Sequence, residues 1–300
     1  MSKMTRSVCL FAHYDPTPDI APHVVHYLKQ LTLCGLDIHL AFSGHDSVPA
    51  HVQKLCDELG IKIYPRPNRG MDFGAWQYLI QQGCLEKAET ILFTNDSIFG
   101  PFYPLQPLFS TMQNLGRDIW GMVESYEMTW HLQSWFLCFK RKAFDHPTIQ
   151  RVFTLPFHEM SKAEIIHHGE LGLGVAIQAA GLTCASCWYA NRRGLRKIIS
   201  LNPMIINWLS VIKSHYVPFI KVELIRDNPV QLFWHYRWRK IVASYAPFFN
   251  PQWVDLYLKK RGSKPLPPKV NLFRIIYFLL LCRNKGTIIQ ALFHTLLQRK

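Results

Sequence analysis

Polar side chains that could bind a ligand or accept a proton follow several apolar stretches of the sequence. The clearest case is TILFTNDS, whose apolar run is followed by Thr94, Asn95 and Asp96, shortly before Gly100 and Pro101. Turns select Asn, Asp, Gly and Pro, so a strand followed by a turn is one interpretation. A binding site at the carboxyl end of a central strand is the other, because open α/β sheets bind ligands at that edge.

Three further apolar stretches end in the same way. The residues concerned are His13, Tyr14 and Asp15 after the first stretch, Ser43 after the second, and Asn68, Gly70 and Asp72 after the third. In a parallel sheet these ends meet at one edge, where amides at helix starts can bind phosphate, so the edge suits a nucleotide. The sequence has neither a G-x-G-x-x-G motif after the first stretch nor a P-loop lysine motif, which argues against a dinucleotide enzyme and a phosphate-loop ATPase.

The elements that must position these residues alternate along the chain. Apolar stretches at 7–15, 36–44, 61–67 and 90–97 predict strands, and residues 22–35, 51–60 and 74–89 predict helices. This alternation predicts parallel strands with right-handed crossovers, an α/β Rossmann-type sheet. Further strands are expected at 118–124 and 134–144, the second leading into a helix, and a helix at 169–181 whose first glycines mark its entry loop.

Charge divides the chain into two unlike parts. Residues 1–189 carry 14 Lys and Arg against 17 Asp and Glu, whereas residues 190–300 carry 20 against 3, which gives the net charge of +14. The excess predicts an anionic partner: nucleic acid, a phosphorylated substrate or a membrane surface. The aromatic and basic stretch FWHYRWRK at 233–240 resembles single-strand binders, but no complete recognition motif accompanies it, so no nucleic-acid partner is expected.

The last thirty residues favour a membrane surface. Their longest apolar run, Ile275–Cys282, is too short to span a bilayer, and basic residues from Arg274 to Lys300 interrupt the apolar ones. An amphipathic anchor on anionic lipid and a hairpin docked on the protein's own core both explain this pattern. The eight cysteines, including the Cys184-x-x-Cys187 pair, predict free thiols in a reducing cytoplasm, so the expected location is the inner face of the cytoplasmic membrane.

Six blocks of sequence resemble the rhamnan synthesis F family of bacterial polysaccharide glycosyltransferases. The blocks are FAHYD (11–15), NRGMDFGAW (68–76), FTNDSIFGP (93–101), HLQSWF (131–136), GEL (169–171), and NPMIINW (202–208) with PFIKVELIRDNP (218–229). The resemblance implies a GT-A-like α/β fold and transfer of a deoxysugar, L-rhamnose from dTDP-rhamnose, to a lipid-linked glycan with inversion. It weakens after Pro229. The expected division is a catalytic domain at 1–200, a helical extension at 201–264 and a basic tail at 265–300.

The resemblance also implies roles for individual residues. In GT-A enzymes the fourth strand ends in an Asp-x-Asp that holds a divalent cation, and here only Asp96 remains, so Mg²⁺ or Mn²⁺ on Asp96 is one possibility. Glu170, expected at the start of a helix, is the first candidate for the catalytic base and His131 the second. The helix dipole alone would also favour a glutamate there. The expected donor-binding residues are His13, Tyr14, Asp15, Asn68, Gly70, Asp72, Asn95, Asp96, Lys221 and Arg226, and the expected acceptor-binding residues are Gln133 and Ser134.

Structural alternatives accompany these roles, and for Asp72 and Asp96 the alternative is a helix-capping aspartate. Lys221 and Arg226 would neutralise the leaving diphosphate, or are surface charges. Trp76, Trp135 and Trp208 could stack on sugars, but aromatic residues in such runs are more often core. At the level of the whole chain, the altered Asp-x-Asp also suits a non-catalytic transferase that acts as a membrane-associated scaffold.

Overall fold

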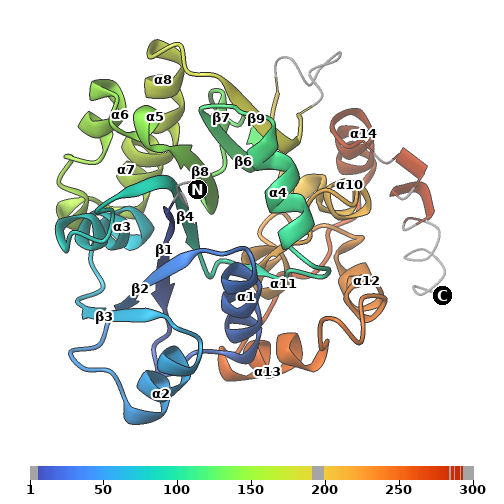
Figure 1. Cartoon of the computed structure of the whole chain (residues 1–300). Helices are drawn as coiled ribbons and strands as arrows, with labels where there is room; N and C mark the ends of the chain where they lie inside the picture. Colours follow the sequence, from blue (N-terminus) through green and yellow to red (C-terminus); the bar gives the residue numbers. More distant parts are fainter. Residues whose placement is uncertain (1–5, 191–198, 284, 287, 291, 293–300) are drawn as a thin grey trace.

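A sheet of eight strands forms the centre of the computed structural model, which describes residues 6–190, 199–283, 285–286, 288–290 and 292 (Figure 1). The strand order is β3-β2-β1-β4-β8-β6-β7, and β9 pairs with β6. The strands β1 to β4 run parallel, whereas β8 is antiparallel to both β4 and β6. The bounds are β1 (Arg6–Tyr14), β2 (Asp37–Ser43), β3 (Lys62–Arg66), β4 (Ala88–Asn95), β6 (Ile119–Ser125), β7 (His131–Leu132), β8 (Phe136–Lys140) and β9 (Cys184–Trp188).

Helices cover both faces of this sheet, which is why its inner strands are almost continuously apolar. Alternate residues of β1 face opposite sides: Cys9 and Phe11 belong to one core cluster, and Val8, Leu10 and Ala12 to the other. The first cluster includes residues of α1 (Pro22–Leu33), α2 (Ala50–Glu58) and α4 (Gln106–Asn114). The second includes residues of α3 (Met71–Gln81), α5 (Arg141–Phe144), α6 (Pro147–Val152), η1 (Phe157–Glu159), η2 (Ile165–Leu171) and α8 (Gly172–Ala179); α7 (Lys162–Glu164) precedes η2.

The C-terminal third adds a helical part with its own apolar cluster. A two-stranded antiparallel sheet of β5 (Ile98–Phe99) and β10 (Ile220–Lys221) joins it to the end of β4. The helices are α9 (Pro203–Ile206), α10 (Trp208–Lys213), α11 (Val222–Asp227), η4 (His235–Arg237), α12 (Trp238–Ala243), α13 (Gln252–Lys260) and α14 (Leu272–Leu281). Figure 1 shows α13 beside α1, far from it in sequence.

The predicted α/β sheet with a mainly helical C-terminal extension is confirmed. Each of the seven elements expected between residues 7 and 97 is present. Two predictions were wrong in detail. The helix expected to reach residue 89 ends at Gln81, before Gly83 with its positive φ of 74°, and no entry loop precedes Glu170, because η2 continues directly into α8.

The tail is described only in part, since Arg299 and Lys300 lie outside the described residues. Its helix α14 buries Phe278 and Leu281 against the C-terminal cluster and exposes Leu272 and Phe273. In the part of the chain that the structure describes, no helix has the length and hydropathy needed to cross a bilayer.

Candidate active site at the strand ends

The register of the sheet explains why distant segments meet at one edge. Because β8 is antiparallel to β4 and pairs Phe136 with Thr94, the residues just before β8 lie beside the carboxyl end of β4. The Thr94 hydroxyl, 2.7 Å from that of Tyr27, donates to the Trp135 carbonyl at 2.8 Å. The edge therefore combines the ends of β1 and β4 with the segment that enters β8.

Asp96 is held by the end of β1. Its Oδ2 lies 2.6 Å from Nδ1 of His13 and accepts a hydrogen bond from the Tyr14 amide at 3.0 Å. Burial lowers the pKa of His13, but the hydrogen bond and charge of Asp96 outweigh it, so the pKa is raised. His13 is 2% exposed, so it orients Asp96 rather than offering an open surface to a donor.

Asp72 and Asn95 form the next contact along the edge. The Asn95 side-chain amide donates to Oδ2 of Asp72 at 2.6 Å, and its oxygen accepts from the Ser97 amide and hydroxyl. Burial, followed by the charge of Asp96, raises the pKa of Asp72 to about 7; Glu170 acts in the same direction and Lys221 opposes it. Asp96 and Glu170 are therefore both close enough to Asp72 for their charges to act on it.

Backbone geometry places Asp72 at this edge. Gly70, with φ of 74°, precedes α3, and Asp72 lies in the first turn of that helix. A Cβ on Gly70 would lie 2.9 Å from the Cα of Gly74 and 3.0 Å from the Phe157 carbonyl carbon, so only glycine fits. Asn68 is exposed beside Gly44 in the loop that leads to this turn.

Glu170 reaches the edge from the π-helical segment η2. Its Oε1 accepts a hydrogen bond from the Ser134 amide at 2.8 Å and lies 4.0 Å from Nε2 of His131. Nδ1 of His131, 3.0 Å from the Thr129 carbonyl, must be the donor there, so Nε2 of a neutral ring faces Glu170 without a proton. Because η2 follows α7 without a break, Glu170 lies inside a helical segment, and a helix-start dipole does not account for it.

The two predicted acceptor residues differ in exposure, since Gln133 is buried and Ser134 is half-buried. Gln133 is 2% exposed, donates to Oδ1 of Asn202 at 2.9 Å and accepts from the Trp135 indole at 3.0 Å. Ser134 contributes its amide to Glu170. The three tryptophans considered as sugar platforms, Trp76, Trp135 and Trp208, are 0%, 3% and 1% exposed and belong to the core.

Of the two cations predicted for the site, Lys221 reaches it and Arg226 does not. Lys221, on β10, acts on the carboxyl groups of Asp72 and Glu127. Its nearest acid is Glu223, with Nζ 3.7 Å from Oε2. Arg226 is engaged elsewhere, because its guanidinium donates two hydrogen bonds to Asp227, at 2.8 and 2.6 Å.

Sequence reasoning missed three residues of this region. Burial raises the pKa of Glu127, which interacts with Lys221, His131 and Glu170. Lys260 and Arg261 place their nitrogens 3.5 and 3.7 Å from the carboxylate of Asp15, which is 2% exposed. Glu127 stands four residues before His131 and could have been considered, but no local pattern connects positions 260 and 261 with the first strand.

Few side chains of this site could bind a divalent cation. Among the described residues, no group of three or more His, Cys, Asp and Glu side chains could hold a metal, and the eight cysteines are free thiols. Asp96 and Asp72 nevertheless bring two carboxyl groups together, and the pKa of Asp72 reflects their repulsion. Mg²⁺ binds through one or two carboxylates plus substrate phosphates, so this pair fits a cation that the donor's diphosphate would help to hold.

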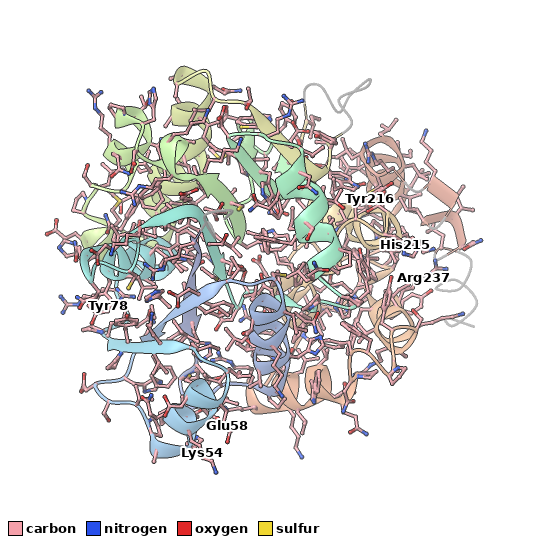
Figure 2. The ribbon with its side chains drawn as sticks, in the orientation of Figure 1. Lys54, Glu58, Tyr78, His215, Tyr216 and Arg237 are labelled. Atoms are coloured by element: carbon pink, nitrogen blue, oxygen red, sulfur yellow. The ribbon has the colours of Figure 1, made fainter. Side chains whose placement is uncertain are left out.

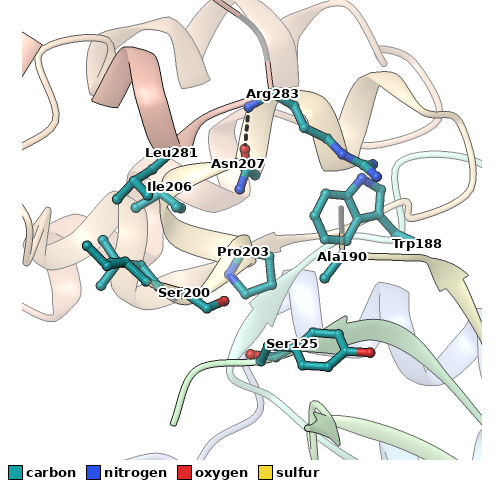
Figure 3. A pocket seen from close by; sticks show the side chains of 12 residues that line it. Ser125, Trp188, Ala190, Ser200, Pro203, Ile206, Asn207, Leu281 and Arg283 are labelled. Carbon is teal, nitrogen blue, oxygen red and sulfur yellow. Dashed lines mark hydrogen bonds between the residues drawn. The ribbon is translucent and has the colours of Figure 1, made fainter. Parts of the chain in front are cut away.

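A separate hollow, partly open to solvent, lies between the sheet and the helical part (Figure 3). The Arg283 guanidinium lies 4.5 Å from the centre of the Trp188 ring, and the Arg283 amide donates to Oδ1 of Asn207 at 2.9 Å. None of the carboxyl groups of the strand-end site lines it. The chemistry-bearing residues are therefore at the sheet edge and not in this hollow.

The fold and the site define a class: an α/β protein with carboxylates and a lysine at the carboxyl ends of parallel strands. The model of one family, "Rhamnan synthesis protein F", matches residues 43–241, about two thirds of the chain. The chain belongs to this family.

The chain is also similar to two individual proteins. "Virulence protein VirA" of Vibrio anguillarum is 27% identical over 205 residues, which cover 58% of this chain and 65% of that protein. The matched region therefore spans slightly less than two thirds of the relative. The crystal structure of mouse xyloside xylosyltransferase 1 in its apo form resembles 62% of this chain and 87% of that one, with 10% identity and a TM-score of 0.34.

Proposed function

We propose that the protein is an inverting glycosyltransferase that moves L-rhamnose from dTDP-rhamnose to a lipid-linked polysaccharide acceptor of the O-antigen or cell-wall rhamnan type. The observation that carries this proposal is the grouping of Asp72, Asp96 and Glu170 with Lys221 at the ends of parallel strands. Carboxylates at such an edge can orient sugar hydroxyls and accept a proton. Membership of a family named for rhamnan synthesis supports the choice of sugar.

In the proposed reaction, an acceptor hydroxyl oxygen attacks the anomeric carbon from the side opposite the diphosphate. The bond from that carbon to the diphosphate oxygen breaks, and the hydroxyl proton passes to Glu170. Glu170 suits this role because the Ser134 amide fixes its Oε1, while no described residue hydrogen-bonds to Oε2. Nε2 of His131, 4.0 Å from Oε1, is the second candidate to accept the proton, a role that requires the neutral ring.

The leaving diphosphate needs positive charge, and Lys221 is the cation that acts on the carboxylates of the site. Lys260 and Arg261 approach from the helical part beside Asp15, whereas the Arg226 guanidinium is paired with Asp227. A Mg²⁺ or Mn²⁺ ion bound by Asp96 and the diphosphate would supply further positive charge. In this proposal residues 1–200 bind the donor, 201–264 complete the site and 265–300 attach the protein to a membrane.

A calorimetric titration with dTDP-rhamnose, dTDP, UDP-sugars and GDP-sugars, each with and without manganese, tests the donor assignment. We expect saturable binding of dTDP-rhamnose, and its dependence on manganese reports whether Asp96 holds a metal. Binding of a different nucleotide sugar would overturn the rhamnose assignment. Failure of every donor to bind would instead favour the non-catalytic scaffold.

The Glu170→Gln variant tests the catalytic base. It should bind the donor as the wild type does but lose transfer by at least about 100-fold, because the amide cannot accept the proton. Glu58→Gln is the matched control, since Glu58 is exposed at the end of α2, just before the start of β3 and therefore at the opposite edge of the sheet (labelled in Figure 2). A fully active Glu170→Gln variant would refute this role.

Attachment to the inner face of the cytoplasmic membrane is part of the same proposal. It is supported by the basic C-terminal part and by the exposed apolar side of α14, where Leu272 and Phe273 are 73% and 77% exposed. Anionic lipid attracts such basic surfaces, and an interfacial helix buries its apolar side chains among the headgroups.

A further inference from the structure

We infer that Arg261, at the C-terminal end of α13, is a positioning residue of the donor site. The family match ends at residue 241, so α13 lies beyond it. This inference rests on the proposed donor site, because its function is to hold the end of β1 in the shape that orients Asp96.

Arg261 contacts both the backbone and the side chain at the end of β1. One guanidinium nitrogen donates to the Tyr14 carbonyl at 3.3 Å and lies 3.7 Å from Oδ2 of Asp15. Nζ of the neighbouring Lys260 is 3.5 Å from the other oxygen of Asp15. Thr17 closes the same loop, since its amide and hydroxyl donate to Asp15 at 2.9 and 2.7 Å.

Tyr14 connects Arg261 with Asp96. The carbonyl of Tyr14 accepts from Arg261, and the amide of Tyr14 donates to Oδ2 of Asp96 at 3.0 Å. His13, the preceding residue, approaches the same oxygen at 2.6 Å. A displacement of the Tyr14 peptide would therefore move the two groups that orient the Asp96 carboxylate.

The Arg261–Asp15 pair differs from an exposed ion pair. Burial raises the pKa of Asp15, but hydrogen bonds from Thr17 and the charges of Arg261 and Lys260 outweigh it, so the pKa is held below its usual value. Asp15 is 2% exposed, and Nε of Arg261 is fully buried without a hydrogen-bond partner among the described residues. Removing Arg261 leaves the buried Asp15 carboxylate with Lys260 and Thr17 on Oδ1 and without its partner near Oδ2.

Aromatic packing fixes α13 in this place. The ring of Tyr257 packs at 4.9 Å from that of His23 on α1 and at 5.4 Å from that of Phe99 on β5. The Arg261 guanidinium lies 5.3 Å from the centre of the same Tyr257 ring. Burial lowers the pKa of His23 to about 3, so the imidazole stays neutral in this aromatic contact. The position of Arg261 thus follows from packing on both sides of Tyr257.

The first test measures hydrogen exchange at the Tyr14 amide by NMR in the full chain without ligand. In Arg261→Ala we expect exchange at this amide to become at least about tenfold faster, while amides in the centre of β1 keep their protection. Arg261→Lys, which retains the charge, should restore part of the protection. The matched control is Arg239→Ala, because Arg239 pairs with Asp255 of α13, at 2.7 Å, on the surface.

The second test measures affinity for dTDP-rhamnose by calorimetry. Arg261→Ala should weaken binding by about tenfold, Arg261→Lys by less, and Arg239→Ala not at all. A double-mutant cycle with Asp15→Asn should show that the effects of the two changes are not additive.

The two tests separate failure of this inference from failure of the proposed function. Unchanged exchange at the Tyr14 amide in a folded Arg261→Ala variant overturns the positioning role, whatever the donor. If the wild type does not bind dTDP-rhamnose, the donor assignment fails, and the exchange measurement still decides whether Arg261 orders the end of β1.

Discussion

Asp72 is the residue whose environment is least suited to its charge. Burial and the neighbouring Asp96 raise its pKa to about 7, whereas an unfolded chain leaves an aspartate near 3.9. The folded protein therefore keeps a proton on Asp72 that the unfolded chain has lost, and stability declines as pH rises from about 4 to about 7. Such unfavourable charge is expected where a ligand or cation completes the site.

Asp72→Asn should remove this decline. At pH 8 we expect the variant to be about 1–3 kcal/mol more stable than the wild type, with no difference below about pH 4. The substituted amide oxygen can still accept from Asn95. Denaturant unfolding across this pH range measures the effect, and Asp46→Asn, in an exposed loop, is the control. A variant less stable than the wild type at pH 8 would contradict the claim that the charge on Asp72 destabilises the folded protein.

For single residues, the sequence predicted which side chains lie at the strand ends better than it predicted which groups they contact. The rule that parallel strands end at one edge is enough to bring His13, Asp72 and Asp96 together, and their contacts in the fold agree with it. It did not predict that Gln133 would be buried against Asn202, because that depends on packing with a segment 69 residues away.

The turn between β3 and α3 is the element that places Asp72. Gly70→Ala should destabilise the protein by about 3 kcal/mol or more, because the new Cβ would lie within 2.9–3.1 Å of backbone atoms of Gly74, Phe157 and His158. Gly83→Ala is the matched control, since Gly83 has the same φ of 74° but open space around it. We expect that control to cost only about 1 kcal/mol.

Thermal or denaturant unfolding of the two variants measures the difference. Equal losses of stability would mean that φ alone requires glycine at position 70 and that the contact with η1 contributes nothing. A larger loss for Gly70→Ala would show that η1 packs tightly on the start of α3.

Elements with strong periodicity were predictable, and those fixed by distant contacts were not. The strands up to β4 follow from apolar runs with turn residues at their ends. The two-residue strands β5 and β10 carry no such signal, because they form only when residues 98–99 meet residues 220–221. The π-helical geometry around Glu170 likewise has no sequence pattern, although Gly169, whose Cβ would lie 3.0 Å from the Phe73 ring, allows the close approach.

At the scale of the molecule, positive charge collects on the C-terminal part. Each of its three acids has a basic neighbour: Glu223 pairs with Lys221, Asp227 with Arg226 and Asp255 with Arg239. The other described lysines of this part outnumber its acids, and one of them, Lys260, pairs instead with Asp15 at the end of β1. The rest are Lys213, Lys240, Lys259, Lys264, Lys269 and Lys285. In Figure 2, His215 and Arg237 lie on the side of the molecule formed by the helices of the C-terminal part.

Helix α14 combines this charge with exposed apolar side chains. Phe278 and Leu281 face the core, whereas Leu272, Phe273 and Ile276 are 73%, 77% and 48% exposed, and Lys269 precedes the helix. The two interpretations of the tail, docking on the core and binding to a membrane, therefore concern opposite sides of one helix. The side away from the core is the one that we expect to bind anionic lipid.

Replacing Leu272 and Phe273 together with Asp should weaken binding to vesicles of phosphatidylcholine mixed with phosphatidylglycerol by at least about tenfold, because each buried apolar side chain contributes about 1.5–3 kcal/mol. Flotation measures the bound fraction, and deletion after Lys269 should abolish it. Leu33→Asp is the control, since Leu33 is 66% exposed at the end of α1. If binding requires phosphatidylglycerol but is the same in the Leu272 and Phe273 variant, the basic helices and not α14 contact the membrane. If the deletion does not change binding, the tail is not the anchor.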